Sequence, residues 1–403
     1  MEDSRVGHSS HPYLLTPGDA DRHLDVVARF VSEAFAGGEH VEEIGQKYLR
    51  NGHYDWDTTQ LIWDADELVH HWGVWGYGMR VDDVSLRTAG VGAVVTRESH
   101  RQRGLMHRAA LASFDAMRAN GYHLSVLRGR HYARYDYVRA WNYVTYRIER
   151  AAISARATAP AFQLLTPGML DAVNHLYNTA HTRLSGTAVR PTYPILDKED
   201  MQVYGWFDDQ GLLCGYVRAP VEEGNTLRCL EGAGDAEECL AVLGALMDER
   251  KQDSLELFSV HHQHPLSQAL RTRACVIEER FFKQSGWQVR MVNLRACLQK
   301  LCPCFERRLQ HSRMAGWEGI LTLEGSRETA DLSVSSGRVV VLDGSASAHF
   351  LRAGAALARF IIGSDQAEEI IRQEEVECGG DGAGLASILF PNLQPLLSHW
   401  DGF

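Results

Sequence analysis

The chain has 403 residues, 45% of them hydrophobic and 23% charged, which supplies ample apolar material for folded cores and length for roughly two to four domains. Its net charge of −11 argues against a nucleic-acid partner and mildly favours cationic partners or substrates. No run of 18 apolar residues predicts a membrane span, and the acidic, polar start Met1–Ser4 has no signal-peptide core, so we expect a cytoplasmic protein.

The cysteines and histidines form no recognisable metal-binding pattern. All eight cysteines lie after residue 213, and Cys302 and Cys304 are the one close pair. This density is far below that of a disulfide scaffold and the spacing fits no zinc site, so we predict reduced structural thiols and no metal. The tract His261–His264 has no cysteine nearby and is predicted to bind no metal. His70 and His71 are expected on the surface of a strand.

The segment before residue 91 predicts a helix followed by strands. Thr16 is a candidate N-cap with Pro17 at the first helical position, and an apolar stripe at helical spacing follows up to Phe35. Strand-like runs come next, at 60–63, 69–81 and 84–86. A helix, antiparallel-looking strands and then strand–helix–strand are typical of an α/β fold with a mixed sheet.

The stretch from residue 91 to residue 137 carries the strongest functional signal. A strand at 91–96 leads through a basic turn at 97–104 into a helix at 105–120, and a second strand follows at 123–127. Unpaired N–H groups and the positive end of the helix dipole can hold a pyrophosphate at such a turn. Four arginines crowd the same place and could neutralise further phosphate charge: Arg97, Arg101, Arg103 and Arg108. Taken alone, the turn is explained as well by a solvated basic helix start.

A repeat divides the rest of the chain. Residues 164–168 reproduce the Leu-Leu-Thr-Pro-Gly of residues 14–18 at an offset of 150 residues, which suggests duplication. The second block contains no Arg-x-x-Gly turn between a strand and a helix, so we interpret it as a domain that has lost a phosphate-binding site. From about residue 294, strands, a hairpin turn at Ser335–Gly337 and then helices predict an α+β domain.

The turn resembles a known cofactor loop. Arg101-Gln102-Arg103-Gly104-Leu105-Met106, between two strands, is similar to the acetyl-CoA loop of the GNAT N-acetyltransferase superfamily, with Met106 where a second Gly or Ala is usual. The resemblance implies that Arg101, Gln102, Arg103, Gly104, Leu105 and Met106 hold the pyrophosphate. It also implies that Val94, Val95 and Thr96 offer backbone groups to the pantetheine arm, which a splayed strand pair or a bulge would free.

The whole chain resembles one branch of that superfamily. An active GNAT domain (1–150), a degenerate GNAT-like domain (151–293) and a sterol-carrier-protein-like α+β domain (294–403) are the layout of the enhanced-intracellular-survival branch. The expected fold class is therefore α/β with mixed sheets. The resemblance further implies an acetyl-CoA-dependent N-acetyltransferase that forms homo-oligomers, hexamers in this branch.

The second motif of the branch falls at Tyr132–Ala140, with Tyr135 in place of Phe and Asp136 in place of Gly. The resemblance makes Tyr132 the general acid that protonates the departing CoA thiolate, and a phenol with a pKa of about 10 is protonated at neutral pH and can donate. Asp136 only tolerates a backbone conformation that Gly adopts freely. Tyr137 is therefore the reserve acid. The alternative is that these tyrosines simply pack a helix.

The chain end resembles the tail of the branch, which threads into the active site of the first domain. The terminal carboxylate of Phe403 would there accept a proton from the substrate ammonium, directly or through water. An alkylammonium with a pKa of about 10 must lose a proton before it attacks a thioester. A free α-carboxylate has a pKa of only about 3.5, so burial near Phe403 and Trp400 would have to raise its proton affinity.

These features and the resemblance predict an N-acetyltransferase that moves acetyl directly to a primary amine of a small cationic molecule, aminoglycoside-like or polyamine-like, or to a lysine side chain. The acids that contact this amine are left open among Glu33, Glu39, Asp55 and Asp57. The alternative is a lipid or hydrophobic-ligand carrier built on the C-terminal domain, with the GNAT halves as a scaffold. An apolar tunnel in residues 300–403 would favour the carrier, and acetyl-CoA binding would favour the enzyme.

Overall fold

The computed structural model describes residues 13–50, 52–153, 158–192, 202–221, 224–282 and 285–403. The segment Met1–Ser4, on which the expectation of no signal peptide depends, lies outside these residues. The chain divides into two compact units. Unit 1 comprises Met1–Gly76, Ala89–Tyr122 and Phe403, and unit 2 comprises Tyr77–Thr88 and His123–Gly402.

Unit 1 contains strands in the order β1-β2-β3-β4, and β2 pairs antiparallel with both of its neighbours. The strands are β1 (Leu14–Pro17), β2 (Gln60–Asp64), β3 (Glu67–Val81) and β4 (Val84–Thr96). The boundary between the units falls inside β3 and β4. The helices of unit 1 are α1 (Ala20–Phe35), α2 (Val41–Glu43), a π-helix at Ile44–Arg50, a 3-10 turn at Glu98–His100 and α3 (Leu105–Ala119).

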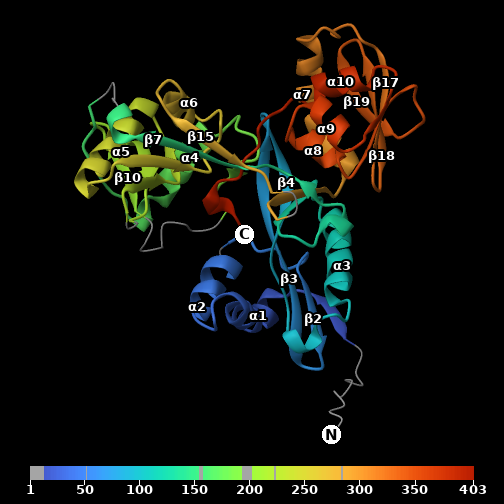
Figure 1. The fold of residues 1–403 in the computed structure, drawn as a ribbon. Coiled ribbons are helices and arrows are strands. Elements are labelled where there is room, and N and C mark those ends of the chain that lie inside the picture. The colour runs from blue at the N-terminus through green and yellow to red at the C-terminus, as the bar shows by residue number, and fades with distance from the viewer. Residues whose placement is uncertain (1–12, 51, 154–157, 193–201, 222–223, 283–284) are drawn as a thin grey trace, which may run out of the picture. The chain divides into compact units, whose positions relative to one another are not determined.

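Helices cover both faces of this sheet (Figure 1). Apolar side chains of α1, among them Val27 and Phe30, form one core together with Trp75. Phe114 of α3 meets the ring of Trp72 edge-on at a centroid distance of 5.9 Å. Because side chains three positions apart on a strand point to opposite faces, α1 and α3 pack on opposite sides of β3.

Unit 2 contains strands of several sheets. The first set is β5-β16-β6, from Leu124–Arg128, Trp287–Met291 and Val138–Arg139, which follows β4 in the strand order of one eight-stranded sheet. The second is β12-β14-β7-β15, from Thr226–Cys229, Ser254–Phe258, Tyr143–Glu149 and Val276–Arg280. The third is β13-β11-β10-β8, from Glu231–Ala233, Leu213–Arg218, Val203–Phe207 and Phe162–Leu164. A short strand, β9 (Ala188–Val189), pairs with the end of β3 at Gly78 and Met79.

The C-terminal part of unit 2 has a five-stranded sheet in the order β19-β18-β17-β20-β21, from Arg338–Asp343, Thr329–Ser335, Gly319–Gly325, His349–Gly354 and Glu377–Gly379. The helices of unit 2 are α4 (Leu170–Ala180), α5 (Ala236–Arg250), α6 (Pro265–Arg271), α7 (Leu294–Gln310), α8 (Leu357–Ile362), α9 (Ala367–Gln373) and α10 (Gly382–Leu389). Short 3-10 turns lie at Ala133–Tyr135, Arg150–Ala152, Pro167–Met169 and His399–Asp401. β17 and β20 are parallel while β17 and β18 are antiparallel, so the predicted mixed α/β class is confirmed.

Strand pairing in unit 2 crosses the predicted boundary at residue 150. β7 precedes that boundary, yet it pairs antiparallel with β14 and β15 from the second block. Conversely, β16 of the second block pairs antiparallel with β5 of the first. The two blocks therefore exchange strands, while their division at residues 150 and 293 stays a prediction.

The predicted helix start at Thr16 and Pro17 is wrong. Both residues belong to β1, where Thr16 pairs with Leu61. The helix begins at Ala20, and its N-cap is Asp19, whose Oδ1 accepts from the N–H groups of Asp21 and Arg22 at 3.0 and 3.1 Å. A Thr-Pro pair favours a helix start only locally, and here the pairing of β1 with β2 decides the conformation.

In the part of the chain that the structure describes, no helix is both long and apolar enough to cross a membrane.

Candidate active site

The basic turn of unit 1 leaves its helix start uncapped. Gly104 stands at the N-cap of α3 with φ of 73°, and no side chain caps the helix there. Gln102 also has a positive φ, 62°. The N–H groups of the first helical turn, at Leu105 and Met106, have no intrahelical acceptor, and they lie at the positive end of the helix dipole. This geometry suits a pyrophosphate.

The four arginines of the turn have different roles. Arg97 is bound elsewhere, because it pairs with Glu67 at 2.8 Å and Glu33 at 3.4 Å. The Arg101 side chain is 61% exposed, and its closest acid is Glu98 at 3.6 Å. An arginine so exposed and so loosely paired can turn to a phosphate at little cost.

Tyr13, which the sequence did not single out, organises the other two arginines. Its hydroxyl accepts from Arg103, and its carbonyl oxygen accepts from Arg108 at 3.1 Å. The hydroxyl also contacts His100 Nδ1 at 3.0 Å. Arg103 donates from its other Nη to the carbonyl of Ser99 at 3.0 Å, which stiffens the turn. Tyr13 thus holds two cationic side chains beside the start of α3.

Strand β4 is irregular where the pantetheine arm was expected. Ala93 has φ of 47°, a left-handed conformation inside a strand that is typical of a β-bulge. His71 donates from Nδ1 to the carbonyl of Ala93 at 2.7 Å, and His71 Nε2 then accepts from the hydroxyl of Tyr54 at 2.6 Å. His70 Nδ1 lies 2.7 Å from Thr96 Oγ1. Val94 and Val95 are half-buried and follow the bulge directly.

The prediction that His70 and His71 lie on a strand surface is wrong, since both side chains are fully buried. The sheet of unit 1 is covered on both faces, so β3 has no solvent-facing side here. Burial lowers the pKa of His70 to about 3 and that of His71 to about 4. Both imidazoles are therefore neutral and act as fixed hydrogen-bonding groups behind β4.

Acidification should therefore destabilise the protein before most carboxylates titrate. In the unfolded chain His70 and His71 take up protons below about pH 6.5, whereas in the fold they do not until about pH 3 to 4. The contribution of these neutral histidines to the free energy of unfolding is present above pH 6.5. It is lost as the pH falls, by up to about 1.4 kcal/mol per pH unit for each group. Urea unfolding of His70→Leu between neutral pH and about pH 5 should show a shallower loss than wild type; an equal slope contradicts the assignment.

The last residue of the chain lies against β4 within unit 1. A Cβ atom added to Gly92 would stand 2.8 Å from the carboxyl carbon of Phe403, and one added to Gly90 would collide with the Phe403 ring. The ring joins the apolar core of unit 1, and the same added Cβ on Gly92 would stand 3.1 Å from a ring carbon of Trp75. The sequence contained a signal for this contact: two glycines at positions i and i+2 of one strand mark the close approach of another backbone.

The four candidate substrate-binding acids of unit 1 differ in their partners and in their exposure. Glu33 is engaged by Arg97. Asp55 accepts from the Tyr122 hydroxyl at 2.5 Å and from the N–H of Thr58 at 3.2 Å. Glu39 and Asp57 are exposed. Asp55 lies next to the aromatic cluster of Tyr54 and Trp56, whereas Glu33 is committed to an ion pair.

The two candidate tyrosines lie in unit 2 and differ in burial. Tyr137 is buried, its hydroxyl is 2.6 Å from Ser125 Oγ, and burial raises its pKa well above the ordinary value. Tyr132 is only partly buried, and burial raises its pKa as well, so it stays protonated at neutral pH. Asp136 adopts φ of 63°, so the left-handed conformation survives without Gly, and Arg327 contacts its carboxylate at 3.1 Å.

The tail is anchored in unit 2 by buried charges that the sequence did not reveal. The Asp401 carboxylate accepts from Arg190 Nε at 3.0 Å and from the Tyr177 hydroxyl at 3.1 Å. Arg190 also donates to Glu231 at 2.7 Å, and Glu231 accepts from Ser398 Oγ at 3.0 Å. Arg190, Glu231 and Asp401 are each at most 4% exposed. Two tail residues are thus fixed by one guanidinium and its partner acid.

A second buried arginine balances the charge of this cluster. Arg218 is fully buried, lies 3.8 Å from Glu231, and places its guanidinium carbon 5.0 Å from the ring centre of Trp400. With it, two cations face two anions, so the group is neutral as a whole. Charge neutrality reduces the cost of burying these groups, and Arg190 adds hydrogen bonds to both carboxylates, whereas Arg218 contributes charge alone.

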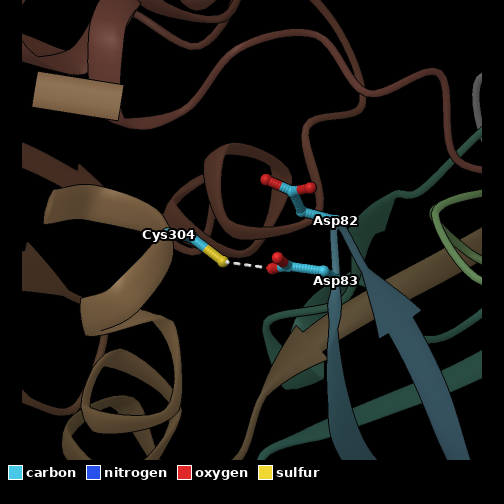
Figure 2. A group of neighbouring side chains, drawn as sticks. All are labelled: Asp82, Asp83 and Cys304. Carbon is cyan, nitrogen blue, oxygen red and sulfur yellow. Dashed lines mark hydrogen bonds between the residues drawn. The ribbon is translucent and has the colours of Figure 1, made fainter. Parts of the chain in front are cut away.

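One cluster in unit 2 has the composition of a metal site. Asp82, Asp83 and Cys304 bring possible ligand atoms within 4.8 Å of one another, and Figure 2 shows the Cys304 thiol pointing at Asp83. Arg307 already contacts both carboxylates, at 2.9 and 2.8 Å, and Arg308 contacts Asp82 at 3.0 Å. Burial raises the pKa of the Cys304 thiol to about 11. The cluster is therefore a set of ion pairs that connects the β3–β4 turn to α7.

The histidine tract of unit 2 serves a structural purpose. His264 is the N-cap of α6 and accepts from the N–H of Leu266 at 3.2 Å, and His261 accepts from the N–H of Gln263 at 3.0 Å. His262 Nδ1 lies 2.6 Å from the Tyr146 hydroxyl. These contacts explain the tract without a metal.

Comparison with known proteins gives a domain match and a fold match. Residues 20–141 match the family described as acetyltransferase (GNAT) domain. A GCN5-related N-acetyltransferase from Anabaena variabilis ATCC 29413 has a TM-score of 0.75 at 16% identity, over 97% of this chain and 100% of that chain. A probable N-acyltransferase of unknown function from Enterococcus faecalis V583 has 0.75 at 15%, over 98% and 100%.

Eis1 from Mycobacterium abscessus is similar too, with a TM-score of 0.70 at 17% identity over 97% of this chain and 100% of that chain. No curated sequence matches the chain. At such identities the solved structures show the fold alone, and the domain match identifies residues 20–141 as a GNAT acetyltransferase domain. The predicted GNAT-like fold and GNAT-type enzyme are therefore confirmed.

Proposed function

Because residues 20–141 form a GNAT acetyltransferase domain, we propose that this enzyme transfers acetyl from acetyl-CoA directly to a primary amine of a small cationic molecule or of a lysine side chain. One observation carries the proposal. The carboxyl carbon of Phe403 lies over Gly92, on the same strand as the Ala93 bulge and in the same unit as the uncapped start of α3. This arrangement supports the proposal, because unit 1 combines a carboxyl group with the strand that we propose holds the thioester.

The residues of the turn fit the acyl donor. Its diphosphate would be held by the N–H groups of Gly104, Leu105 and Met106, with Arg101 and Arg103 adding charge. Gln102, with its positive φ, shapes the turn. Backbone groups of Val94, Val95 and Thr96 would hold the pantetheine arm beside the bulge. The donor supplies an activated acetyl thioester.

The chain's own groups would move the protons. The Phe403 carboxylate accepts a proton from the substrate ammonium, directly or through water, which frees the amine lone pair for attack on the thioester carbonyl. A backbone N–H of β4 polarises the carbonyl oxygen. Tyr132 donates its phenolic proton to the leaving thiolate. No covalent enzyme intermediate is needed, and the first cysteine of the chain is Cys214, beyond this domain.

Charge reversal in the turn tests donor binding. Arg101→Glu combined with Arg103→Glu should weaken acetyl-CoA binding at least about 100-fold, since each arginine contributes a charge-assisted contact of about 1.5–3 kcal/mol. Calorimetry with acetyl-CoA measures this. The matched control is Arg22→Glu on α1, because the Arg22 side chain is 80% exposed. This variant should bind acetyl-CoA like wild type. Full affinity in the double variant contradicts the proposal. A panel of amines assayed for CoA release then identifies the acceptor.

Tyr132→Phe should lower kcat by roughly 100-fold and leave acetyl-CoA affinity unchanged, because only the proton donor is lost. Steady-state kinetics with calorimetry separate the two effects. Tyr137→Phe is the control: it loses the contact with Ser125 and about 1 kcal/mol of stability but should keep kcat within a few-fold. If Tyr137→Phe lowers kcat and Tyr132→Phe does not, the general acid is Tyr137. If kcat is unchanged in both variants, neither tyrosine takes part in the mechanism.

From the resemblance to the enhanced-intracellular-survival branch, we further propose three properties of this enzyme. Residues 151–293 form a second GNAT-like domain without a cofactor site, residues 294–403 form a sterol-carrier-like domain, and the enzyme assembles as a hexamer. Sedimentation of the purified full chain tests the last of these; a monomer contradicts it.

A further inference from the structure

Two adjacent histidines of β3 contact the part of β4 to which the proposed mechanism assigns the pantetheine arm. Successive side chains of a strand point to opposite faces of the sheet, so His70 and His71 reach β4 from different sides. His71 Nδ1 lies 2.7 Å from the carbonyl oxygen of Ala93, and His70 Nδ1 lies 2.7 Å from Thr96 Oγ1. The two contacts therefore fall on the first and last residues of the segment 93–96.

The hydrogen bond from His71 has a fixed direction. A carbonyl oxygen only accepts, so the proton of the neutral imidazole is on Nδ1 and Nε2 must accept. The Tyr54 hydroxyl, 2.6 Å from Nε2, is the donor, and burial raises the pKa of Tyr54 well above its usual value. Burial also lowers the pKa of His71 to about 4, which keeps the imidazole neutral. Tyr54, His71 and the Ala93 carbonyl therefore keep one arrangement of protons at neutral pH.

Packing fixes the same side chains in space. Tyr54 meets the rings of Trp56 and Trp75 edge-on, at centroid distances of 4.6 and 4.9 Å. The imidazole of His71 lies beside Gly73, where an added Cβ would stand only 2.6 Å from His71 Cε1. Any side chain at position 73 would therefore displace the imidazole that donates to β4.

Ala93, the residue that accepts this hydrogen bond, is the one with the left-handed conformation. A φ of 47° is costly for a residue with a Cβ atom and persists only where the surroundings impose it. A buried donor that is fixed on two sides imposes it here. A bulge of this kind leaves backbone groups of its strand without partners on the neighbouring strand. Such groups are the ones that the proposed mechanism offers to the acyl donor.

We propose that His70 and His71 are positioning residues, which hold the segment 93–96 in the conformation that accepts the pantetheine arm of acetyl-CoA. His71 sets the bulge at Ala93 from one face of the sheet, and His70 fixes the end of the segment at Thr96 from the other. Neither imidazole moves a proton in the reaction. The inference rests on the proposed function, because it assigns both residues to the binding of acetyl-CoA.

Calorimetry with two ligands tests this role without an acceptor amine. On the proposed mechanism acetyl-CoA contacts both the turn before α3 and the segment 93–96, whereas adenosine 3′-phosphate 5′-diphosphate lacks the pantetheine arm and reaches only the turn. His71→Gln should weaken acetyl-CoA binding about tenfold and keep the affinity for the fragment within about twofold of wild type. His175→Gln is the control with the same substitution, at an exposed position of α4, and should change neither affinity.

An asparagine at the same position should restore binding. Its amide nitrogen is as far from Cβ as Nδ1 of histidine, whereas the amide nitrogen of glutamine is as far from Cβ as Nε2. His71→Asn should therefore keep acetyl-CoA affinity within about threefold of wild type. Its smaller side chain leaves the larger void, so it should be the less stable of the two variants in urea. An acetyl-CoA affinity that follows stability instead indicates a structural role and overturns the proposal.

Milder variants cover the case in which the His71 variants do not fold. Tyr54→Phe keeps the ring but removes the donor to His71, and Thr96→Val keeps the shape but removes the hydroxyl that His70 contacts. Each should weaken acetyl-CoA binding about threefold and leave the affinity for the fragment unchanged.

The outcomes separate this inference from the proposed function. Unchanged acetyl-CoA affinity in Tyr54→Phe or in Thr96→Val overturns the role of the histidine that the variant tests, and equal weakening of both ligands overturns the proposal as a whole. If wild-type protein does not bind acetyl-CoA, the proposed function itself fails. The two failures are therefore distinguishable.

Discussion

Removal of Phe403 alone should lower kcat for acetyl transfer by about 10²- to 10⁴-fold, the range that a general base supplies. The deletion moves the chain's terminal carboxylate away from Gly92, where the Phe403 carboxyl carbon now lies, and leaves the uncapped start of α3 untouched. Acetyl-CoA affinity should therefore stay within a few-fold of wild type. Stopped-flow or steady-state kinetics, with calorimetry on the same preparation, measure both quantities.

Matched variants separate the carboxylate from the ring. A semi-synthetic protein with an amidated C-terminus keeps the ring but loses the charge, and it should be as slow as the deletion. Phe403→Ala keeps the carboxylate and should retain more activity. Gly92→Ala places a methyl group where the carboxyl carbon lies and should also lower kcat. Full activity in the amidated protein would exclude the terminal carboxylate as the base.

Arg190→Met should reduce the free energy of unfolding by about 3–5 kcal/mol, because it leaves the buried carboxylates of Glu231 and Asp401 without their closest cation. Urea unfolding measures the loss. Arg147→Met is the control: the Arg147 side chain is 55% exposed and pairs with Glu256 at 2.9 Å, so its loss should cost less than about 1 kcal/mol. Equal effects of the two variants would contradict the assignment.

The same variant has a diagnostic pH dependence. Burial alone raises the pKa of Glu231, but the charges of Arg190 and Arg218 outweigh it and hold that pKa well below its usual value. In wild type this contribution to stability is present above about pH 4.3 and is lost as the pH falls below it. In Arg190→Met the carboxylate protonates more readily, so the difference in stability between the two proteins should narrow in acid.

The cost of this variant extends to catalysis on the proposed mechanism. Asp401 precedes Phe403 by two positions, so the loss of its ion pair frees the segment that carries the proposed base. kcat should fall toward that of the Phe403 deletion, while acetyl-CoA affinity is preserved. Breaking such a buried set is costly, but an apolar set of the same volume would often be as stable, so on the proposed mechanism anchoring the tail gives these charges a role beyond stability.

Local patterns predicted the elements of the first block well. The helix expected at 105–120 is α3, which ends at Ala119, and the strands expected around it are the end of β4 and β5. Apolar spacing decides such elements, because it reports which face is buried. The helix start predicted at Thr16 and Pro17 was wrong because capping is a local signal, and here the pairing of β1 with β2 outweighs it. Asp19, three positions on, was the actual cap.

The site itself was less accessible to the sequence. The turn before α3 could be located from the sequence, since its signal lies within six neighbouring residues, 101–106, while its binding of a phosphate stays a prediction. Phe403 contacts Gly90 and Gly92 across more than 300 residues of sequence. The two glycines indicate that another backbone approaches the strand, but only the resemblance suggested which residue does so. Arg190, Glu231 and Asp401 are separated by 41 and 211 residues, and no local pattern announces such a group. The burial of His70 and His71 was equally hard to predict from the sequence, because it depends on helices that cover both faces of the sheet.

The position of Phe403 has a consequence for how the enzyme becomes active. On the proposed mechanism the Phe403 carboxyl group over Gly92 must be free, so a residue joined to it would remove the proposed base while the donor-binding turn of unit 1 stays folded. By the same reasoning, a carboxypeptidase that trims one residue silences the enzyme without unfolding it, and a purification tag belongs at the N-terminus.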